Sequence, residues 1–385
     1  MMPMYCPSCR SSLSDSCARK ATCIGCGETY PIIGSIPVLV PNPEHYLARS
    51  LLAAARARRR AMTAISEVER VHRSKASAFR RDLMGRVSSG LALNLRLLEE
   101  QEQILRRSVR PIALAVARGE TISNRIVNKI ARLMGVSLSP LLRDSLQRPI
   151  GYRFDQALEY LWSDWAGTSE GERQITTIQR AVSERIKRYC DRGGRAVYLG
   201  AGLGRHAFEG GKHFSSIVAT EISFASAALF MVLRAGPVDF CGVNWMGAAS
   251  ERELVQLHRA VFPTENYGST IDYVIADALL LPIPDASLEA VVSIFFTDVI
   301  PLSRLLPEVR RVLRPGGRFI SVGPLVYHFE DKAEWLTQEE MRFVIRSMHE
   351  MTFEPGDTVL EIPYMDHPGS IRAINRIWSF VATRR

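Results

Sequence analysis

The stretch Arg195-Ala-Val-Tyr-Leu-Gly-Ala-Gly-Leu-Gly-Arg205 runs a short apolar strand into a turn that contains Gly200, Gly202 and Gly204. Glycine has no Cβ atom, so this backbone can turn sharply and approach a ligand closely. A helix after the turn would present unpaired amide groups at the same place. The pattern is typical of a site for a nucleotide-type cofactor, but a glycine turn alone does not say which cofactor.

The residues that follow the turn predict an alternation of strands and helices. A second apolar run, Ser216 to Thr220, ends in Glu221, which is placed to accept hydrogen bonds from ribose hydroxyls. Such alternation favours a mostly parallel sheet with helices on both faces and ligands at the carboxyl ends of its strands. We expect strands near 195–200, 216–221, 272–276, 289–295 and 318–323, and helices near 205–211, 223–234 and 301–313.

Length and composition predict a globular protein of two or three domains. The chain has 385 residues, of which 46% are hydrophobic, so it has ample core material. No run reaches the ~18 apolar residues of a membrane span, and residues 1–20 are too polar for a signal peptide. We therefore expect a cytoplasmic protein without membrane association.

Two Cys-x-x-Cys pairs, Cys6 with Cys9 and Cys23 with Cys26, are separated by thirteen residues. At this spacing a pair of turns can present four thiolates tetrahedrally to Zn²⁺. A disulfide framework fits poorly in a reducing cytoplasm, and a redox motif does not account for two matched pairs. Four cysteines close the coordination shell, so we predict a structural zinc ion. Cys17 lies between the pairs and is either spare or a substitute ligand.

The next segment, Tyr30-Pro-Ile-Ile-Gly-Ser-Ile-Pro-Val-Leu-Val40, resembles the end of the short zinc-ribbon domains related to the methyltransferase activator Trm112. This resemblance covers about forty residues. It implies a ribbon that packs on a methyltransferase, and it does not identify a substrate.

Residues 41–150 carry 21 Lys and Arg but nine Asp and Glu, in a chain whose net charge is +9. Such a block can bind nucleic acid, an acidic peptide or a partner protein, and it is more often a solvated helical face. Long patterns rich in Ala, Leu and Arg predict four or five helices. We expect these helices to break at Pro111, Gly119, Gly135, Pro140 and Pro149.

Several apolar residues are interpreted as packing rather than as contacts to a cofactor. Four keep helical spacing and are assigned to a core or lid: Leu91, Leu95, Leu98 and Ile104. Trp162 and Trp165 are also expected to pack a lid, although an aromatic ring beside a sulfonium could add a cation–π attraction.

Three more motifs follow the glycine turn in order. They are Ala276-Asp277-Ala278 after the third strand, Leu281-Pro-Ile-Pro-Asp-Ala-Ser287 before the fourth, and Leu313-Arg-Pro-Gly-Gly317 before the fifth. This order resembles the class I S-adenosylmethionine-dependent methyltransferases. An NAD-dependent dehydrogenase is the rival for the glycine turn, and the last two motifs disfavour it.

The resemblance implies a cofactor site for S-adenosyl-L-methionine. Glu221 would bind the ribose, and Asp277 with Ala278 would contact the adenine. The other cofactor residues implied are Gly200, Gly202, Gly204, Arg205 and Ile294.

A closer resemblance rests on four segments and implies the acceptor. Gly200 to Arg205 with Glu221-Ile-Ser223, Phe295-Phe-Thr-Asp298, Gly323-Pro-Leu-Val-Tyr-His-Phe329, and Ser163-Asp-Trp165 with Glu172-Arg173 resemble the carnosine N-methyltransferase family. That family methylates an imidazole nitrogen of a histidine-containing dipeptide. Carried over by position, Asp298 and His328 would face the substrate, with Tyr327 and Tyr364 near it.

These residue types suit methylation of an imidazole. A neutral ring nitrogen, with a free pKa of about 6.5, can attack the sulfonium methyl group in line. Asp298 can accept a hydrogen bond from the other ring nitrogen and stabilise the positive charge that develops. His328 could position the substrate or relay its proton. Most of the acceleration would come from holding nitrogen, methyl and sulfur collinear.

Structural alternatives remain open for the same residues. Asp298 could be the N-cap of a helix that begins near Pro301, and His328 could be a satisfied core histidine. Tyr327 and Tyr364 could serve packing alone. The chain also departs from the family pattern, because Ser163 and Tyr160 stand where arginine and glutamine are expected. The methionine part of the cofactor would then be held differently, with Arg205 as the candidate.

The sequence thus predicts an α/β chain with three parts. These are a zinc ribbon (1–40), a basic helical segment or lid (41–150) and a Rossmann-like, seven-stranded methyltransferase domain (151–385). The expected function is N-methylation of a histidine imidazole, or a related amine, in a small peptide or peptide precursor. The alternatives are an RNA base methyltransferase and a non-catalytic scaffold that binds the cofactor. A protein partner at the ribbon or basic helices, and an oligomer, are compatible with this sequence.

Overall fold

The computed structural model of the chain describes residues 3–14, 19–74, 76–133, 154–191, 193–245, 247–263, 267–348, 351–364 and 373–385. Cys17 and the helix breaks expected at Gly135, Pro140 and Pro149 lie outside these residues. None of the described helices is both long and apolar enough to span a membrane.

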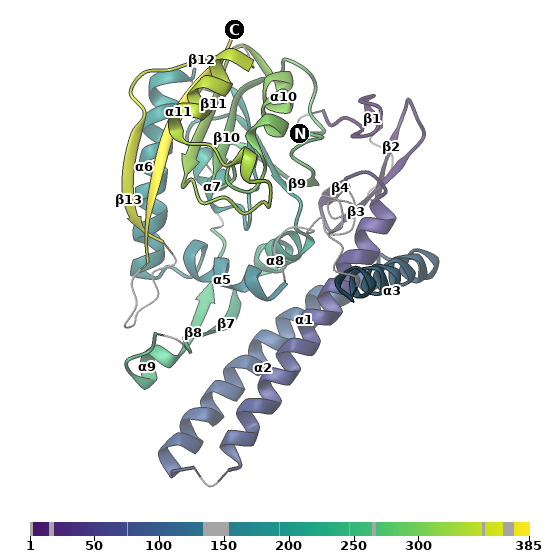
Figure 1. Ribbon diagram of the computed structural model, residues 1–385, viewed down its shortest axis with the longest axis vertical. Coiled ribbons are helices and arrows are strands. Elements are labelled where there is room, and N and C mark those ends of the chain that lie inside the picture. Colours follow the sequence, from purple (N-terminus) through teal and green to yellow (C-terminus); the bar gives the residue numbers. More distant parts are fainter. Residues whose placement is uncertain are drawn as a thin grey trace.

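A large twisted sheet forms the body of the protein (Figure 1). Its strands lie in the order β1-β2-β3-β4-β9-β6-β5-β10-β11-β14-β12, with β13 paired to β14. The neighbours from β4 to β11 run parallel, and β14 is antiparallel to β11. The central strands are β5 (Arg195–Leu199), β6 (Ser216–Glu221), β9 (Thr270–Ala276), β10 (Leu288–Ile294) and β11 (Leu313–Gly323).

All five expected strands are confirmed, and so are the three expected helices. Helices α7 (Arg205–Gly210), α8 (Phe224–Ala235) and α10 (Leu302–Val312) connect the parallel strands. Beyond β11 the sheet is completed by three carboxyl-terminal strands, β12 (Met351–Phe353), β13 (Thr358–Pro363) and β14 (Ile374–Arg384). The strand order β9-β6-β5-β10-β11-β14-β13 makes the predicted seven-stranded, Rossmann-like sheet.

Both faces of this sheet are buried, because its side chains alternate between two cores. In β5, Ala196 and Tyr198 pack in one core, and Val197 and Leu199 pack in the other. The first core also contains α5 (Phe154–Asp164), α6 (Ser169–Tyr189) and α8. The second contains α10, α11 (Gln338–Phe343) and part of the ribbon. A 3₁₀ turn (Lys332–Glu334) precedes α11, and a π-helical turn (Val344–Met348) follows it.

The amino-terminal ribbon is joined to the main sheet by backbone pairing. It comprises β1 (Leu13–Ser14), β2 (Lys20–Cys23), β3 (Thr29–Ile33) and β4 (Ile36–Leu39). Strand β4 lies parallel to β9, with Val38 opposite Ile275 and Leu39 opposite Ala276. The ribbon therefore extends the methyltransferase sheet at its β9 edge.

Two long helices project from the sheet as a hairpin (Figure 1). They are α1 (Pro43–His72) and α2 (Ala78–Arg106), and α3 (Pro111–Leu133) crosses α1. Helix α3 begins at Pro111 as expected, but the break expected at Gly119 is wrong, since the helix runs through it. A Cβ atom at Gly119 would meet nothing within 4 Å, so this glycine costs only its low helix propensity of about 1 kcal/mol.

A small antiparallel hairpin between α8 and β9 was not expected. It consists of β7 (Val238–Val243) and β8 (Val255–Ala260), with the short helix α9 (Glu251–Leu254) between them. The side chain of Asn94 on α2 holds this hairpin: its amide donates to the carbonyl of Cys241 at 2.7 Å and accepts from the Cys241 amide at 2.8 Å. The hairpin thus supports the side of α2.

Candidate cofactor and acceptor site

The glycine turn has the backbone that the sequence predicted. Gly200, Gly202 and Gly204 have φ angles of 57°, 55° and 79°, in the left-handed region that disfavours other residues. A Cβ atom on Gly200 would lie 2.3 Å from Phe296, whereas one on Gly202 would point into open space. The turn is therefore packed tightly beneath Gly200 and open at Gly202, where a ligand can approach the backbone.

Glu221 holds this turn in place from the end of β6. Its carboxylate accepts hydrogen bonds from the amide of Gly202 at 2.9 Å and the amide of Ser223 at 2.7 Å. Its side chain is buried, and burial raises its pKa. Two tyrosines brace the same region: Tyr273 donates to the carbonyl of Gly202, and Tyr46 on α1 donates to the carbonyl of Ile222 at 2.7 Å.

The other cofactor residues lie at the carboxyl ends of neighbouring strands. Asp277 follows β9, and its Oδ1 accepts from the amide of Leu279 at 2.9 Å. Ala278 is buried beside it, and Ile294 ends β10. Because β9, β6, β5 and β10 are adjacent and parallel, these residues share one edge of the sheet with the glycine turn.

Arg205 lies at the start of α7 and is held by acidic partners. Its guanidinium donates to both carboxylate oxygens of Glu172 at 3.0 and 3.1 Å and to the backbone carbonyl of Asp164 at 2.5 Å. It also lies over the ring of Trp165, whose indole N–H donates to the carbonyl of Leu203. Arg205 thus ties the α5–α6 segment to the glycine turn, and its contact with the methionine part of the cofactor stays a prediction.

Asp298 and His328 face each other beyond β10. The distance between His328 Nε2 and Asp298 Oδ2 is 3.7 Å, and the His328 amide donates to the Asp298 carbonyl at 2.8 Å. Asp298 is 4% exposed, whereas 63% of the His328 side chain is exposed. Among the described residues, Asp298 Oδ1 has no hydrogen-bond partner. Burial raises the pKa of Asp298 to about 6, and His328 opposes that shift.

Both structural alternatives for this pair are wrong. The N-cap of α10 is Pro301, which accepts no side-chain hydrogen bond, so Asp298 does not cap that helix. A ring as exposed as that of His328 is not a core histidine. The pair therefore joins an exposed imidazole to a buried carboxylate, one oxygen of which has no hydrogen-bond partner among the described residues.

The two candidate tyrosines both have packing partners. The hydroxyl of Tyr327 donates to the carbonyl of Leu336 at 2.5 Å. The ring of Tyr364 stacks on Phe295, with centroids 4.6 Å apart and an angle of 12° between planes. Packing is thus established for both, and their contact with a substrate stays a prediction.

Two features of this region were not predicted from the sequence: the contact of Tyr46 and the backbone conformation of Phe295. Tyr46 carries no local signal, because its partner Ile222 lies 176 residues away. Phe295 has a φ of 51°, unusual for a bulky residue, and its amide donates to the carbonyl of Val322. This strained turn after β10 directs the chain toward Asp298, and no pattern in the sequence could have indicated it.

The four cysteines of the ribbon come together as predicted. The sulfur atoms of Cys6, Cys9, Cys23 and Cys26 all lie within 4.8 Å of one another. Cys6 is 3.7 Å from Cys26, and Cys9 is 3.3 Å from Cys23. A tetrahedral zinc site with Zn–S bonds of about 2.3 Å places its sulfurs about 3.8 Å apart, so this donor set fits Zn²⁺.

Comparison with known families agrees with the strand order and the glycine turn. Residues 197–321 match the family model described as "Methyltransferase domain". The chain contains a class I S-adenosylmethionine-dependent methyltransferase domain. The residues of this domain fit its cofactor, because the open position at Gly202 lies beside the buried carboxylate of Glu221.

A curated relative is similar to this chain over about half of its length. Carnosine N-methyltransferase of Rattus norvegicus is 27% identical over 203 residues, which cover 49% of this chain. The chain spans about half the length of this relative, since the match covers 50% of it.

Solved structures with a similar outline are methyltransferases of low identity. A phosphoethanolamine N-methyltransferase of Haemonchus contortus is 14% identical, with a TM-score of 0.38, and the match covers 65% of this chain and 60% of that structure. A putative S-adenosylmethionine-dependent methyltransferase of Methanococcus maripaludis is 15% identical, with a TM-score of 0.37, and the match covers 62% and 95% of the two chains.

Proposed function

We propose that the chain methylates a histidine imidazole, or a related amine, in a small peptide or peptide precursor. The observation that carries the proposal is the buried carboxylate oxygen of Asp298, which has no partner among the described residues and lies beside His328. A buried hydrogen-bond acceptor that lacks a partner favours a ligand that supplies a hydrogen-bond donor. The identity of 27% with a carnosine N-methyltransferase supports the same class of acceptor.

The chemistry of this pair suits an imidazole. When bound, S-adenosylmethionine supplies an electrophilic methyl group. Asp298 accepts the N–H of one ring nitrogen, which fixes the tautomer and leaves the lone pair of the other nitrogen for attack. As the ring becomes positive, the carboxylate stabilises its charge in a partly desolvated position. His328 lies within reach of the same carboxylate and takes part in positioning the substrate.

The test is an assay with S-adenosylmethionine and histidine-containing dipeptides, carnosine among them. We expect the wild-type protein to add one methyl group to the imidazole, detected by mass spectrometry of the peptide. Asp298→Asn should lower kcat/KM by about a hundredfold, in the range found for removal of a general acid or base. Cofactor affinity, measured by calorimetry, should stay unchanged in this variant.

The matched control is Asp331→Asn. Asp331 is exposed, and its carboxylate accepts a hydrogen bond from Ala333 at the 3₁₀ turn, a role that asparagine can keep. Unchanged turnover in Asp298→Asn, or a methyl group on a site other than nitrogen, would contradict the proposal. Cofactor binding without turnover on any peptide or RNA would favour a non-catalytic scaffold.

For the ribbon we propose a structural zinc ion bound by Cys6, Cys9, Cys23 and Cys26. The support is the convergence of four sulfurs within 4.8 Å, which leaves no ligand position for chemistry. Metal analysis of the purified protein should give one zinc per chain. A protein that is folded, metal-free and indifferent to added zinc would contradict this assignment.

An RNA base is the second candidate acceptor, and the excess of Lys and Arg in residues 41–150 is the observation that favours it. Against it, Phe295-Phe-Thr-Asp298 after β10 differs from the Asn/Asp-Pro-Pro-aromatic signature of adenine N6 enzymes. Steeply salt-dependent RNA binding, together with methyl transfer to the RNA, would identify RNA rather than a peptide as the methyl acceptor.

A further inference from the structure

Several arginines lie on one face of α1. Arg56, Arg59 and Arg60 are spaced as i, i+3 and i+4, with Arg49 two turns earlier, so all four share a face. Helix α3 packs against α1 and adds Arg125 to the group. The two helices are joined by a contact between His45 Nε2 and Glu120 at 3.1 Å, and by an ion pair of Glu44 with Arg110, the residue before α3, at 3.1 Å. We call Arg49, Arg56, Arg59, Arg60 and Arg125 the arginine cluster.

The arginine cluster is unusual because its like charges repel one another. Arg56 is half-buried, and its pKa is lowered first by burial and then by the other four arginines of the cluster. No carboxylate of the described chain forms an ion pair with Arg56, Arg59 or Arg125. The opposite face of α1 differs, since Arg58 there donates to the buried Glu102 on α2 at 2.8 Å.

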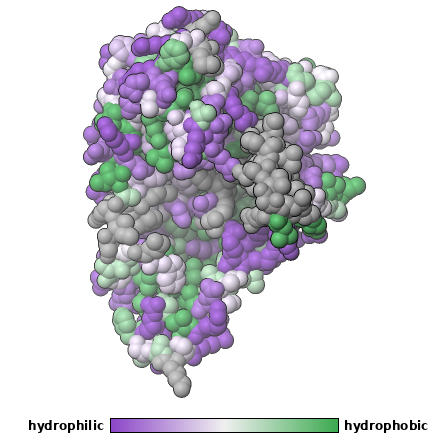
Figure 2. Space-filling view, viewed as in Figure 1, coloured by the Kyte–Doolittle hydropathy of each residue, from purple (hydrophilic) through white to green (hydrophobic). Residues whose placement is uncertain are grey.

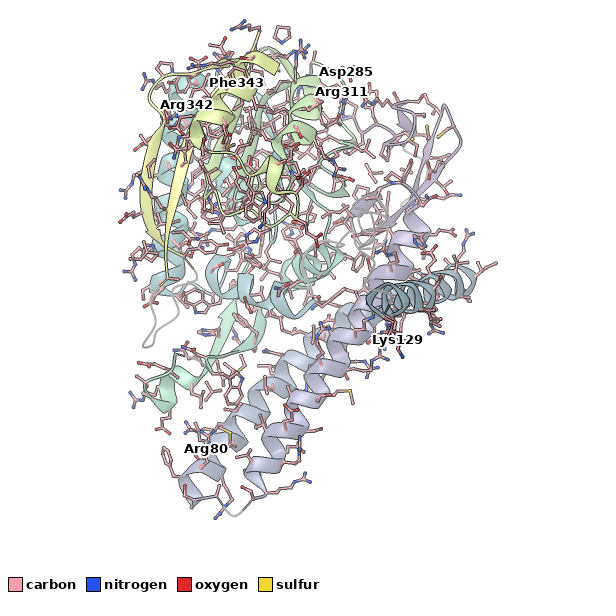
Figure 3. The ribbon with its side chains drawn as sticks, viewed as in Figure 1. Arg80, Lys129, Asp285, Arg311, Arg342 and Phe343 are labelled. Carbon is pink, nitrogen blue, oxygen red and sulfur yellow. The ribbon has the colours of Figure 1, made fainter. Side chains whose placement is uncertain are left out.

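The cluster borders an open pocket of about 440 Å³, lined by Arg56, Arg59, Arg60, Thr63, Ala64 and Glu67. Its single acid, Glu67, lies at the far end and pairs with Arg70 at 3.9 Å. Hydrophilic residues lie on the α1–α2 hairpin beside its crossing with α3 (Figure 2), and Lys129 extends from α3 near the same crossing (Figure 3). The pocket thus offers guanidinium donors, a hydroxyl and positive potential.

These observations limit the ligand to a compact polyanion. A carboxylate brings one charge and two oxygens, too few for a cluster of this size. A phosphate group carries about two charges and three acceptor oxygens, and guanidinium forks match it well. We propose that this pocket binds a phosphate-bearing anion, with a pyrophosphate group as the best match.

The arrangement disfavours a single strand of RNA as the occupant. A strand needs cations spaced along a groove and aromatic rings on which bases stack. Here three of the five guanidiniums, those of Arg56, Arg59 and Arg60, line one open pocket, and none of its six lining residues is aromatic. The pocket also lies on α1, away from Asp298 at the end of β10, so its ligand is distinct from the methyl acceptor.

The test uses inorganic pyrophosphate and the full-length protein in low-salt buffer. Calorimetry should show saturable binding of one pyrophosphate, which raises the melting temperature and weakens with added salt. Arg56→Gln and Arg59→Gln should each weaken binding by about tenfold or more, the loss expected for one charge-assisted contact. The control is Arg80→Gln, an equal change of charge at the far tip of the hairpin (Figure 3), which should leave affinity unchanged.

A second readout separates binding from a structural role. Without ligand, Arg56→Gln should raise the melting temperature at low salt, because it removes repulsion among like charges. A structural arginine would show the opposite shift. A titration with adenosine triphosphate distinguishes a nucleotide ligand from free pyrophosphate. If adenosine triphosphate binds more tightly than pyrophosphate, the ligand is a nucleotide; if the two bind equally, it is the free anion.

Three results would overturn the proposal. The first is an absence of pyrophosphate binding at low salt. The second is binding that Arg56→Gln, Arg59→Gln and Arg80→Gln weaken equally, which indicates diffuse surface charge. The third is tight binding of an RNA oligonucleotide with none of pyrophosphate, which would assign the cluster to a nucleic-acid backbone.

Discussion

The ribbon and the outer half of the α1–α2 hairpin both precede the glycine turn in sequence, but they join the rest of the protein differently. The ribbon contributes β4 to the main sheet, and Cys6, Cys23 and Tyr30 pack in the same core as Ala276 and Ala278. The amide of Tyr5 also donates to the carbonyl of Pro282 at 3.0 Å. On this side Asp285 pairs with Arg311 of α10 at 2.6 Å (Figure 3), and Arg10 pairs with Glu308 of the same helix at 3.6 Å.

The outer half of the hairpin has a small core of its own. Val68, Leu83, Met84 and Val87 pack with Leu254 of α9, apart from the two cores of the sheet. Segments that share a core unfold together, whereas a satellite cluster can open alone. The ribbon should therefore control the cofactor site, and the outer hairpin should not.

The largest effect that can test this contrast comes from the proposed zinc site. Cys23→Ser removes a buried ligand and should lower the stability of the whole protein by several kcal/mol, since metal binding contributes directly to folding. One thermal transition should shift, and cofactor affinity should fall with it. Cys190→Ser, outside the cysteine cluster, is the control. A separate early transition would mean that the ribbon melts alone.

A matched pair of core truncations gives the next effect. Leu39→Ala in β4 and Leu83→Ala in the hairpin remove the same atoms from buried positions, at about 2–5 kcal/mol each. Leu39→Ala should weaken S-adenosylmethionine binding, because Leu39 pairs with Ala276, the residue before Asp277. Leu83→Ala should instead speed hydrogen exchange within the hairpin and leave that affinity unchanged. If both variants lost the same S-adenosylmethionine affinity, the ribbon and the outer hairpin would not differ in their coupling to the cofactor site.

The pH dependence of turnover should be set by Asp298, which follows β10 in the main sheet, and not by the outer hairpin. Burial raises the pKa of Asp298 to about 6, so the carboxylate becomes protonated below that pH and can no longer accept the imidazole N–H. The substrate imidazole also protonates near pH 6.5. We expect kcat/KM to fall about a hundredfold per pH unit well below 6, and about tenfold in Asp298→Asn. Leu83→Ala should keep the wild-type profile.

The smallest effect is expected where the base of the hairpin touches the cofactor turn. Tyr46→Phe removes the hydrogen bond to the Ile222 carbonyl, which is worth about 1 kcal/mol. Cofactor affinity should weaken by about fivefold, measured by calorimetry, with the fold retained. An unchanged affinity would show that α1 has no part in shaping this turn.

What the sequence predicted correctly was local. Each central strand is a short apolar run followed by a turn residue, and Gly200, Gly202, Gly204 and Glu221 lie within one strand–helix–strand unit. Their geometry depends on neighbours in sequence, so the pattern was sufficient. Asp298 and His328 were identified by a resemblance; their side chains approach to 3.7 Å, and their role toward a substrate stays a prediction.

What the sequence could not predict depends on distant contacts. The pairing of Val38 with Ile275 joins segments that no periodicity links, and the turn that ends α1 at His72 has no proline or glycine to mark it. There Ser77 caps α2 by accepting from the amide of Arg80. Gly119 misled the prediction because a solvent-facing glycine is tolerated inside a helix that packing stabilises.

The parallel pairing of β4 with β9 also sets a problem of timing during synthesis. Val38 emerges from the ribosome 237 residues before its partner Ile275. At about 5–20 residues per second, that interval is on the order of 10 to 50 s. Through it, β4 has β3 on one side and an apolar, unpaired edge on the other, the kind of edge that recruits other chains. The nascent protein therefore needs that edge shielded, by a chaperone or by its own early helices, until β9 arrives.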